Sequence, residues 1–298
     1  MVVFHLPLDT VPFAPLLLLP GIHKLLQGLY HFAQAAMKFL SLAWSALLAL
    51  PALAQQHTYN ESTEVQTYLN PILWNDLPDL EVIRVNETYY YTTSTFQFSP
   101  GAAILRSYDL VNWEYIGHSV PRLEFNPQEA YDLENGQQAY VDGIWASSMR
   151  YRPSDETFYW IGCITANNTY IYTAQDPAGE WELASTIGNC YYDCGLLFDE
   201  DDSIFVAFGS YNISIAELNQ DLTEKSVTTV YYGETFIEGA RLYNINGTYY
   251  IQVTEPADRQ WTMKSSGDIY GPWEIEILAD YVNSTVENPG IGIPGKST

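Results

Sequence analysis

The sequence is poor in basic residues. Of its 298 residues only 12 are Lys or Arg, against 36 Asp or Glu, which gives a formal net charge of −24. A surface this acidic repels phosphate, so we expect neither nucleic acid nor a membrane as a partner of the mature protein. The length suffices for one large domain or two small ones, and the apolar fraction of 47% allows a sizeable core.

Cysteine is also scarce, and the chain holds only Cys163, Cys190 and Cys194. Cys190 and Cys194 flank Asp193 closely enough to form a disulfide that would stiffen its loop. Cys163 would then be a buried free thiol. Three cysteines allow three single pairings, and the sequence does not choose among them. No His lies near them, so zinc is not expected.

The apolar run after Met37 is too short to span a bilayer, which takes ~20 apolar residues. It reads MKFLSLAWSALLALPALAQQ, with a basic residue, an apolar stretch and a small-x-small cleavage pattern. We therefore expect a signal peptide at 37–54, an unstructured upstream extension at 1–36 and a linker at 55–67. A signal anchor or a two-helix membrane segment is the alternative.

Acceptor triplets for N-glycosylation, Asn-x-Ser/Thr, are frequent. Together with the signal peptide they predict a secreted, extracellular glycoprotein. The acceptor residues are Asn60, Asn86, Asn167, Asn212, Asn246 and Asn283.

From Tyr68 onward, short runs rich in β-branched and aromatic residues replace helical periodicity. A repeated unit has a carboxylate or Trp near its start, then a strand, a turn, an aromatic strand and a closing strand. The four aromatic strands are TYYYTT, TFYWIG, SIFVAFG and TYYIQV, and Asn-Glu, Asn-Asn and Asn-Gly stand at the expected turns. Three units close on a Trp-Glu pair, in NWEYIG, EWELA and PWEIEI. This spacing favours an all-β propeller over residues 68–298, with about four blades, rather than a sandwich.

Three carboxylates stand at comparable places in these units. Asp79, Asp193 and Glu238 each precede the aromatic run of their unit. The first strand of a propeller blade lines the axis, so the three should converge at one mouth. Converging carboxylates suit cleavage of a glycosidic bond, which needs an acid and a base or nucleophile. The alternative is that they are turn and edge residues of a very acidic protein.

Several segments carry a resemblance to a known family. Four segments resemble, in their order and spacing, the motifs of glycoside hydrolase family 43. They are NPILWNDLPDLEVIRV with the following TYY and TSTF, GIWASSMRYRPSDETFYWIG, YDCGLLFDEDDSIFVAFG, and IEGARLYNINGTYYI. That family comprises five-bladed β-propeller enzymes that include β-xylosidases and α-L-arabinofuranosidases. The resemblance runs from about Tyr68 to about Asp280.

The resemblance implies roles for the three carboxylates. Asp79 corresponds to the general base, Glu238 to the general acid, and Asp193 to the residue that orients the acid and tunes its pKa. An anionic Asp193 would raise the pKa of Glu238. Such a protein would be an inverting exo-glycosidase acting on terminal xylose or arabinofuranose of plant hemicellulose. A non-catalytic carbohydrate-binding propeller and an endo-arabinanase are the alternatives.

Further residues follow from the same resemblance. Phe96 and Trp145 correspond to aromatic walls of the terminal sugar pocket, although Trp145 would equally fit a core between blades. We expect Asp76 to support the base and to contribute to substrate binding, and Glu81 to be solvated. His118 is expected to be structural. No cofactor is required and no residue of the chain is predicted as a metal ligand.

The chain departs from the family pattern at three places. Leu80 stands where the family has Pro, and Cys194-Gly195 where it has Pro-Ser. Ala240-Arg241 stands where the family has Pro followed by an apolar residue or His. A fifth blade, and the structural calcium found near it in the family, would follow at about residue 293. We therefore expect the propeller to be C-terminally incomplete, its calcium site lost and its activity in doubt. GIGIPGKS at 290–297 fits a phosphate-binding loop, but no helix follows it, so nucleotide binding is not expected.

Overall fold

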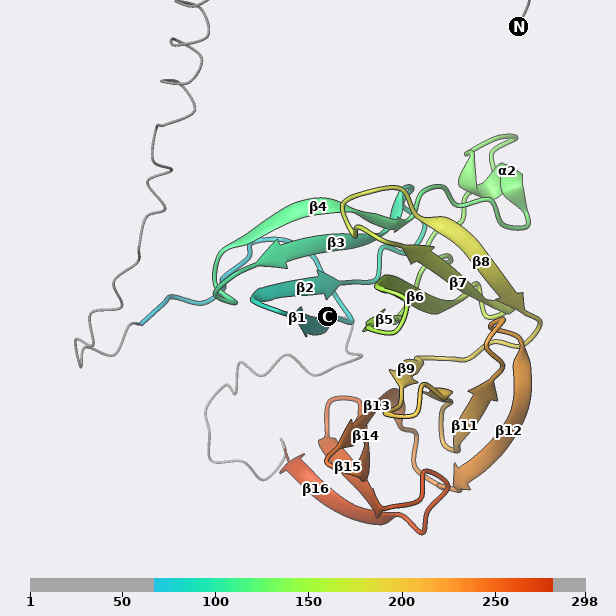
Figure 1. Cartoon of the computed structure of the whole chain (residues 1–298). Coiled ribbons are helices and arrows are strands. Elements are labelled where there is room, and N and C mark those ends of the chain that lie inside the picture. The colour runs from blue at the N-terminus through green and yellow to red at the C-terminus, as the bar shows by residue number, and fades with distance from the viewer. Residues whose placement is uncertain (1–66, 281–298) are drawn as a thin grey trace, which may run out of the picture. The chain divides into compact units, whose positions relative to one another are not determined.

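The structure, a computed structural model, describes residues 67–280. Four antiparallel four-stranded sheets are arranged around a common axis as the blades of a β-propeller (Figure 1). The predicted all-β propeller with four blades is confirmed, and the sandwich alternative is wrong. The predicted signal peptide and upstream extension, nearly all of the linker, and the phosphate-loop-like tail lie outside the described residues.

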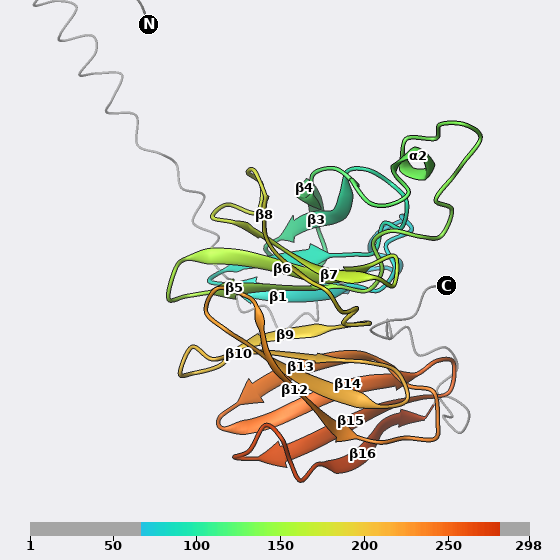
Figure 2. The same cartoon turned by 90° about the vertical axis from the view of Figure 1, so that its right-hand side faces the viewer.

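Each blade runs in chain order from an inner to an outer strand, and the inner strands follow one another around the axis (Figure 2). The strands are β1 (Glu81–Val85), β2 (Thr88–Thr92), β3 (Gly101–Ser107) and β4 (Trp113–Val120) in blade 1; β5 (Ser148–Arg152), β6 (Thr157–Ile164), β7 (Asn168–Ala174) and β8 (Glu182–Ile187) in blade 2; β9 (Gly195–Phe198), β10 (Ile204–Phe208), β11 (Ile213–Leu218) and β12 (Glu224–Tyr231) in blade 3; and β13 (Glu238–Ile245), β14 (Thr248–Glu255), β15 (Arg259–Ser266) and β16 (Glu274–Asp280) in blade 4.

Within residues 67–280 the only α-helix is the single turn α2 (Gln128–Tyr131). No helix in that range is long and apolar enough to cross a membrane.

The hairpin turns lie where the sequence predicts them. Asn246 and Gly247, between β13 and β14, both have positive φ, the backbone that a two-residue turn matched to strand twist requires.

The hydrophobic core is divided into three layers, one between each pair of successive blades. Because side chains alternate along a strand, neighbouring residues enter different layers. Trp160 of β6 faces blade 1, whereas Ile161 faces blade 3. Leu196 and Leu197 of β9 divide in the same way between blades 2 and 4. A blade with two buried faces explains why its inner and middle strands are nearly continuous apolar runs.

The predicted Trp-Glu repeat marks outer strands. Trp113 begins β4, and Trp181 and Trp273 directly precede β8 and β16. Trp181 is buried among the residues between blades 1 and 2, and Trp273 packs beside the layer between blades 3 and 4. The outer strand of blade 3, β12, lacks this pair.

The prediction that Glu81 is solvated is wrong. Glu81 is the first residue of β1 and only 4% exposed. It accepts hydrogen bonds from the Met149 amide (3.0 Å) and from the Arg150 guanidinium of β5. Arg150 also lies 5.5 Å from the centre of the Tyr243 ring on β13. Glu81 is therefore buried because a cation on the neighbouring inner strand compensates its charge.

The cysteines pair differently from the Cys190–Cys194 bridge considered above. Cys163 of β6 forms the disulfide with Cys190, and Cys194 is a buried free thiol. The Cys194 thiol instead points at the carbonyl of Ile161, 3.6 Å away. The bridge therefore ties blade 2 to the segment that leads into blade 3.

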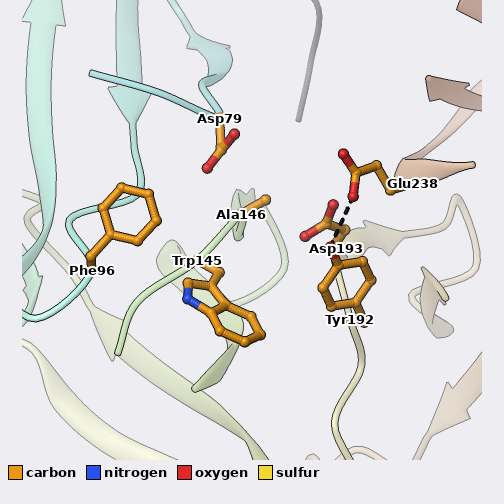
Figure 3. Close-up of a pocket in the computed structure, with 7 residues that line it drawn as sticks. All are labelled: Asp79, Phe96, Trp145, Ala146, Tyr192, Asp193 and Glu238. Atoms are coloured by element: carbon orange, nitrogen blue, oxygen red, sulfur yellow. Dashed lines mark hydrogen bonds between the residues drawn. The ribbon is translucent and has the colours of Figure 1, made fainter. Parts of the chain in front are cut away.

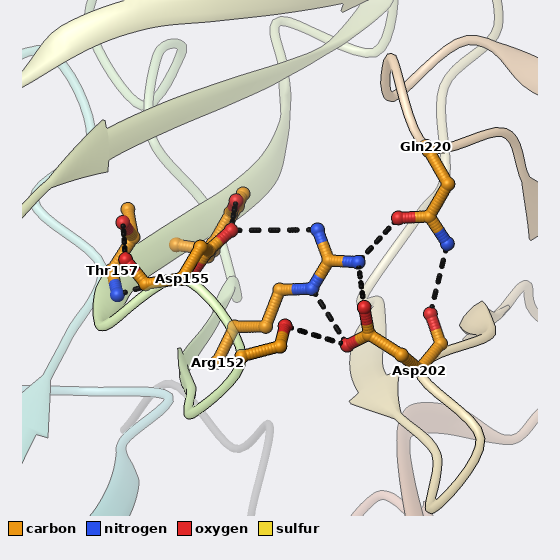
Figure 4. Close-up of polar contacts among 7 residues, drawn as sticks. Arg152, Asp155, Thr157, Asp202 and Gln220 are labelled. Atoms are coloured by element: carbon orange, nitrogen blue, oxygen red, sulfur yellow. Dashed lines mark hydrogen bonds and ion pairs between the residues drawn. The ribbon is translucent and has the colours of Figure 1, made fainter.

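Polar side chains also join blades 2 and 3 (Figure 4). Arg152, the last residue of β5, donates to both carboxylate oxygens of Asp202 and to the Gln220 side chain. Asp155 pairs with the same guanidinium, which lies 5.2 Å from the centre of the Phe198 ring. This cluster links three hairpin turns of two blades at the far ends of their inner strands.

Replacing Gly195 with Ala should destabilise the propeller. A Cβ at Gly195 would lie 2.3 Å from the Ala240 carbonyl oxygen of β13, so the two inner strands would have to separate. We expect the free energy of unfolding to fall by about 1–3 kcal/mol, as for other overpacked sites. Denaturant unfolding measures it. Gly188→Ala is the matched control, because a Cβ there meets no atom within 4 Å; equal stability of the two variants would contradict the close approach.

Candidate active site

One pocket gathers residues from all four blades. Its volume is about 240 Å³, and it opens where the inner strands begin. Figure 3 shows Asp79 on one side, Glu238 on the other and Asp193 next to Glu238. The lining residues are Asp79, Phe96, Trp145, Ala146, Tyr192, Asp193 and Glu238.

Asp79 reaches the pocket two residues before β1. It is 8% exposed, has a φ of 54°, and accepts a hydrogen bond from the Ser94 hydroxyl at 2.7 Å. The preceding carbonyl of Pro78 accepts from the Ser94 amide (3.1 Å) and the Thr93 hydroxyl (2.5 Å). Burial raises the pKa of Asp79, while the Ser94 hydrogen bond and the charge of Arg241 oppose the rise.

Glu238 is the first residue of β13 and lies partly exposed on the pocket wall. The Tyr192 hydroxyl donates a hydrogen bond of 2.8 Å to it. Burial raises the pKa of Glu238, the Tyr192 hydrogen bond opposes this, and the charge of Asp79 adds to it. Tyr192 thereby fixes one carboxyl oxygen of Glu238.

Asp193 is the most buried of the three carboxyl groups, with 5% of its surface exposed and a φ of 50°. The backbone amide of Gly239, the residue after Glu238, favours the ionised form of Asp193 and lowers its pKa. Burial raises the pKa of Asp193 to about 8, with the charge of Glu238 as the second cause. Asp193 and Glu238 therefore retain a proton between them at a pH at which free carboxyl groups have lost theirs.

Aromatic rings form the remaining walls. Phe96 has a φ of 49° and is held by two backbone hydrogen bonds to Ile144, of 2.9 and 3.0 Å. Trp145 is partly exposed and donates to the Val141 carbonyl at 2.9 Å. Its ring meets that of Tyr192 edge to face, 6.2 Å between centroids. Trp145 thus lines the pocket, whereas Trp160 and Trp181 are buried between blades 1 and 2.

Residues 68–297 match the family Glycosyl hydrolases family 43. The chain belongs to this family. The match covers the whole of the propeller that the structure describes.

Proteins related to this family 43 chain have been characterised. It is 30% identical over 227 residues to the non-reducing end alpha-L-arabinofuranosidase BoGH43B of Bacteroides ovatus, covering 72% of this chain and 41% of that protein. It is also 30% identical over 250 residues to a beta-xylosidase of Formosa agariphila, covering 72% and 41% of the two chains. The chain therefore spans less than half the length of these relatives.

Solved structures agree with the fold. A glycoside hydrolase of family 43, engineered to display both endo-xylanase and exo-arabinofuranosidase activity, superposes with a TM-score of 0.68 at 43% identity. The superposition covers 74% of this chain and 44% of that one. The Bacteroides ovatus xyloglucan-locus family 43 protein follows at a TM-score of 0.60 and 29% identity, over 70% of this chain and 42% of the other.

Five of the six predicted site residues of this family 43 chain line the pocket: Asp79, Phe96, Trp145, Asp193 and Glu238. Asp76 does not, and its side chain is exposed. Its charge still acts on Asp79, whose pKa it raises, so its contribution to substrate binding stays a prediction. His118 lies on the outer strand β4, away from the pocket.

Sequence reasoning missed Tyr192 and Ser94. Tyr192 directly precedes a predicted site residue, but 24 tyrosines give no reason to select this one. Ser94 lies 15 residues after its partner Asp79, and only the fold joins them. No group of three or more His, Cys, Asp or Glu side chains within 67–280 is placed to hold a metal ion.

Replacing Ser94 with Ala should raise the pKa of Asp79. The hydrogen bond from Ser94 stabilises the ionised carboxylate of Asp79. Removing this hydrogen bond therefore favours the neutral acid. We expect a loss of about 1–3 kcal/mol in unfolding free energy at neutral pH as well. The measurement is a ¹³C NMR titration of the aspartate carboxyl groups, with the Asp79 signal assigned through Asp79→Asn.

The matched control is Ser119→Ala. The Ser119 hydroxyl is buried without a hydrogen-bond partner in the described residues, so its loss should change neither the titration nor the stability appreciably. An Asp79 signal that titrates alike in wild type and Ser94→Ala would refute the assignment of Ser94 as its hydrogen-bond donor.

Proposed function

We propose that this family 43 chain is an inverting exo-glycosidase that removes terminal xylose or arabinofuranose from hemicellulose. The observation that carries the proposal is the meeting of Asp79, Asp193 and Glu238 in one small aromatic-walled pocket. Names of relatives, an arabinofuranosidase and a beta-xylosidase, support the choice of pentose.

The proposed reaction is a single displacement. Asp79, as the general base, takes a proton from a water molecule while the water oxygen bonds to the anomeric carbon. Glu238, as the general acid, gives its proton to the glycosidic oxygen as the bond to the anomeric carbon breaks. The sugar leaves with inverted configuration, and solvent returns the two carboxyl groups to their starting states. Inversion requires about 6.5–9.5 Å between the working carboxyl groups, so that water fits between them.

The pocket supports action at a chain end. Its volume of about 240 Å³ falls below the usual range of ligand pockets, about 300–1,000 Å³, and favours one sugar ring over several. Phe96 and Trp145 offer flat apolar faces for the C–H face of a sugar ring. An endo-acting arabinanase would need an extended groove, and chromatography of the products separates the two: single sugars indicate exo action and longer fragments endo action.

We further propose that the protein is secreted and glycosylated. The Cys163–Cys190 disulfide favours an oxidising compartment. Each acceptor asparagine within the described residues is exposed, as glycosylation requires; these are Asn86, Asn167, Asn212 and Asn246. A xylan- or arabinan-type oligosaccharide would then be met outside the cell.

Replacing Glu238 with Gln should separate the two carboxylate roles. Without the acid, hydrolysis of xylo- or arabino-oligosaccharides should slow by about 10²–10⁴. The rate of hydrolysis of p-nitrophenyl xyloside or arabinofuranoside should fall less, because nitrophenolate leaves without needing a proton. Asp79→Asn should slow both substrate types alike, since every substrate needs the activated water. Released sugar and nitrophenol report the rates, and ¹H NMR reports the anomer first formed.

Glu87→Gln is the matched control, because the Glu87 side chain is 90% exposed and, among residues 67–280, pairs only with neighbouring Arg84. It should retain the wild-type rate. Equal background rates from wild type, Glu238→Gln and Asp79→Asn would exclude the glycosidase and leave the carbohydrate-binding propeller.

A further inference from the structure

Two exposed aromatic rings stand beside the pocket without lining it. Tyr211 lies in the turn between β10 and β11 and is 47% exposed, and Phe236 lies just before β13 and is 37% exposed. Their rings meet edge to face, with 5.2 Å between the centroids. Neither residue is among those that line the pocket. Tyr211 and Phe236 are called the rim pair below.

Backbone contacts place the rim pair on the Glu238 side of the pocket. Phe236 precedes Glu238 by two residues. The amide of Gly209, at the start of the turn that carries Tyr211, donates to the Tyr192 carbonyl at 2.9 Å. The Tyr192 hydroxyl in turn donates to Glu238. Because β10 runs antiparallel to β9, it ends where β9 begins, so the turn lies at the end of the propeller at which the pocket opens.

The loops that carry the rim pair are joined without the two rings. The Asn212 side-chain oxygen accepts a hydrogen bond from the Gly233 amide at 3.2 Å. A Cβ at Gly233 would lie 2.7 Å from the Tyr211 carbonyl oxygen, so the two backbones are already in close contact there. A packing role therefore does not account for two neighbouring rings left in solvent, whereas a ligand-binding role does.

The reaction proposed above determines what lies on this side of the pocket. Glu238 gives its proton to the glycosidic oxygen, and that oxygen departs with the leaving group. The leaving group therefore lies on the Glu238 side while the terminal sugar occupies the pocket. In a polysaccharide the leaving group is itself a sugar, and the C–H face of a sugar ring packs on an aromatic ring.

We propose that Tyr211 and Phe236 bind the leaving-group sugar and so make the protein selective for a glycoside whose leaving group is a sugar. The proposal rests on the function proposed above. The pocket, at about 240 Å³, has room for one sugar ring, and the rim pair receives the next ring of the chain. The protein would then recognise two units of its substrate and release one.

The test compares substrates that differ only in their leaving group. Xylobiose or arabinobiose, whichever wild type hydrolyses, has a sugar as leaving group, and the matching glycosyl fluoride has a single atom that cannot reach the rim pair. In Tyr211→Ala and in Phe236→Ala, the ratio of kcat/KM on the disaccharide to that on the fluoride should fall about tenfold, mainly through KM. Tyr211→Phe keeps the ring and should restore most of the ratio. Released pentose measures every rate.

Tyr108→Ala is the matched control, because Tyr108 is 63% exposed but follows β3, at the end of the propeller away from the pocket. It should leave the ratio unchanged. A glycan on Asn212 would stand next to Tyr211, so every protein is first treated with an endoglycosidase. Equal losses on both substrates in the rim variants would show that the rings only support the pocket. An unchanged rate on both would show that they touch no substrate. Either result overturns the proposal.

A binding measurement separates this proposal from the proposed function. In Asp79→Asn, calorimetric titration should show tighter binding of the disaccharide than of its monosaccharide, and adding Tyr211→Ala should remove most of that difference. If it does so but wild type hydrolyses no glycoside, the rim pair has its assigned role and the proposed function is wrong. If wild type hydrolyses the disaccharide but Tyr211→Ala leaves the binding difference intact, the proposed function stands and the role of the rim pair is refuted.

Discussion

The close approach of inner strands at the propeller axis is the constraint on which the site depends. Between β9 and β13 the two backbones approach so closely at Gly195 that a single added methyl would overlap the Ala240 carbonyl. Because these strands lie so near each other, the residues just ahead of β1 and β9 and at the start of β13 open into one space. Residues separated by more than 150 positions in the chain, such as Asp79 and Glu238, line one pocket for this reason.

The backbone at the pocket is as specialised as its side chains. Asp79, Phe96 and Asp193 all have φ near 50°, a region that side chains with a Cβ enter at a cost. Hydrogen bonds hold the backbone there. The Pro78 carbonyl accepts from Thr93 and Ser94, and Phe96 exchanges backbone hydrogen bonds with Ile144. The main chain thus orients Asp79 and Asp193, and hydrogen bonds from Ser94 and Tyr192 fix oxygens of Asp79 and Glu238.

Much of the fold and of the pocket could be predicted from the sequence, because both follow repeated local patterns. Aromatic runs recur once per blade, the Asn-Glu, Asn-Asn and Asn-Gly turns and the Trp-Glu pairs occur in three of the four blades, and the three carboxylates share one place in the repeat. What could not be predicted depends on contacts between blades. Glu81 is an ordinary acidic residue in the sequence, and it is buried only because Arg150 of another blade meets it.

The sequence left the cysteine pairing open for the same reason. Cys190 and Cys194 are close enough in the chain to form a bridge, but strand geometry turns Cys194 toward Ile161 and leaves Cys190 facing β6. Asp76 shows the converse, since closeness to Asp79 in the chain did not bring its side chain into the pocket lining.

The Cys163–Cys190 bridge has a practical consequence. The disulfide joins the segment that carries Tyr192 and Asp193 to β6 of blade 2, three residues before Asp193. Protein made in a reducing cytosol would lack this disulfide, although its sequence would still contain every residue of the pocket. A recombinant preparation from such a host would then be an unsuitable reference for any assay of this pocket, whatever its purity.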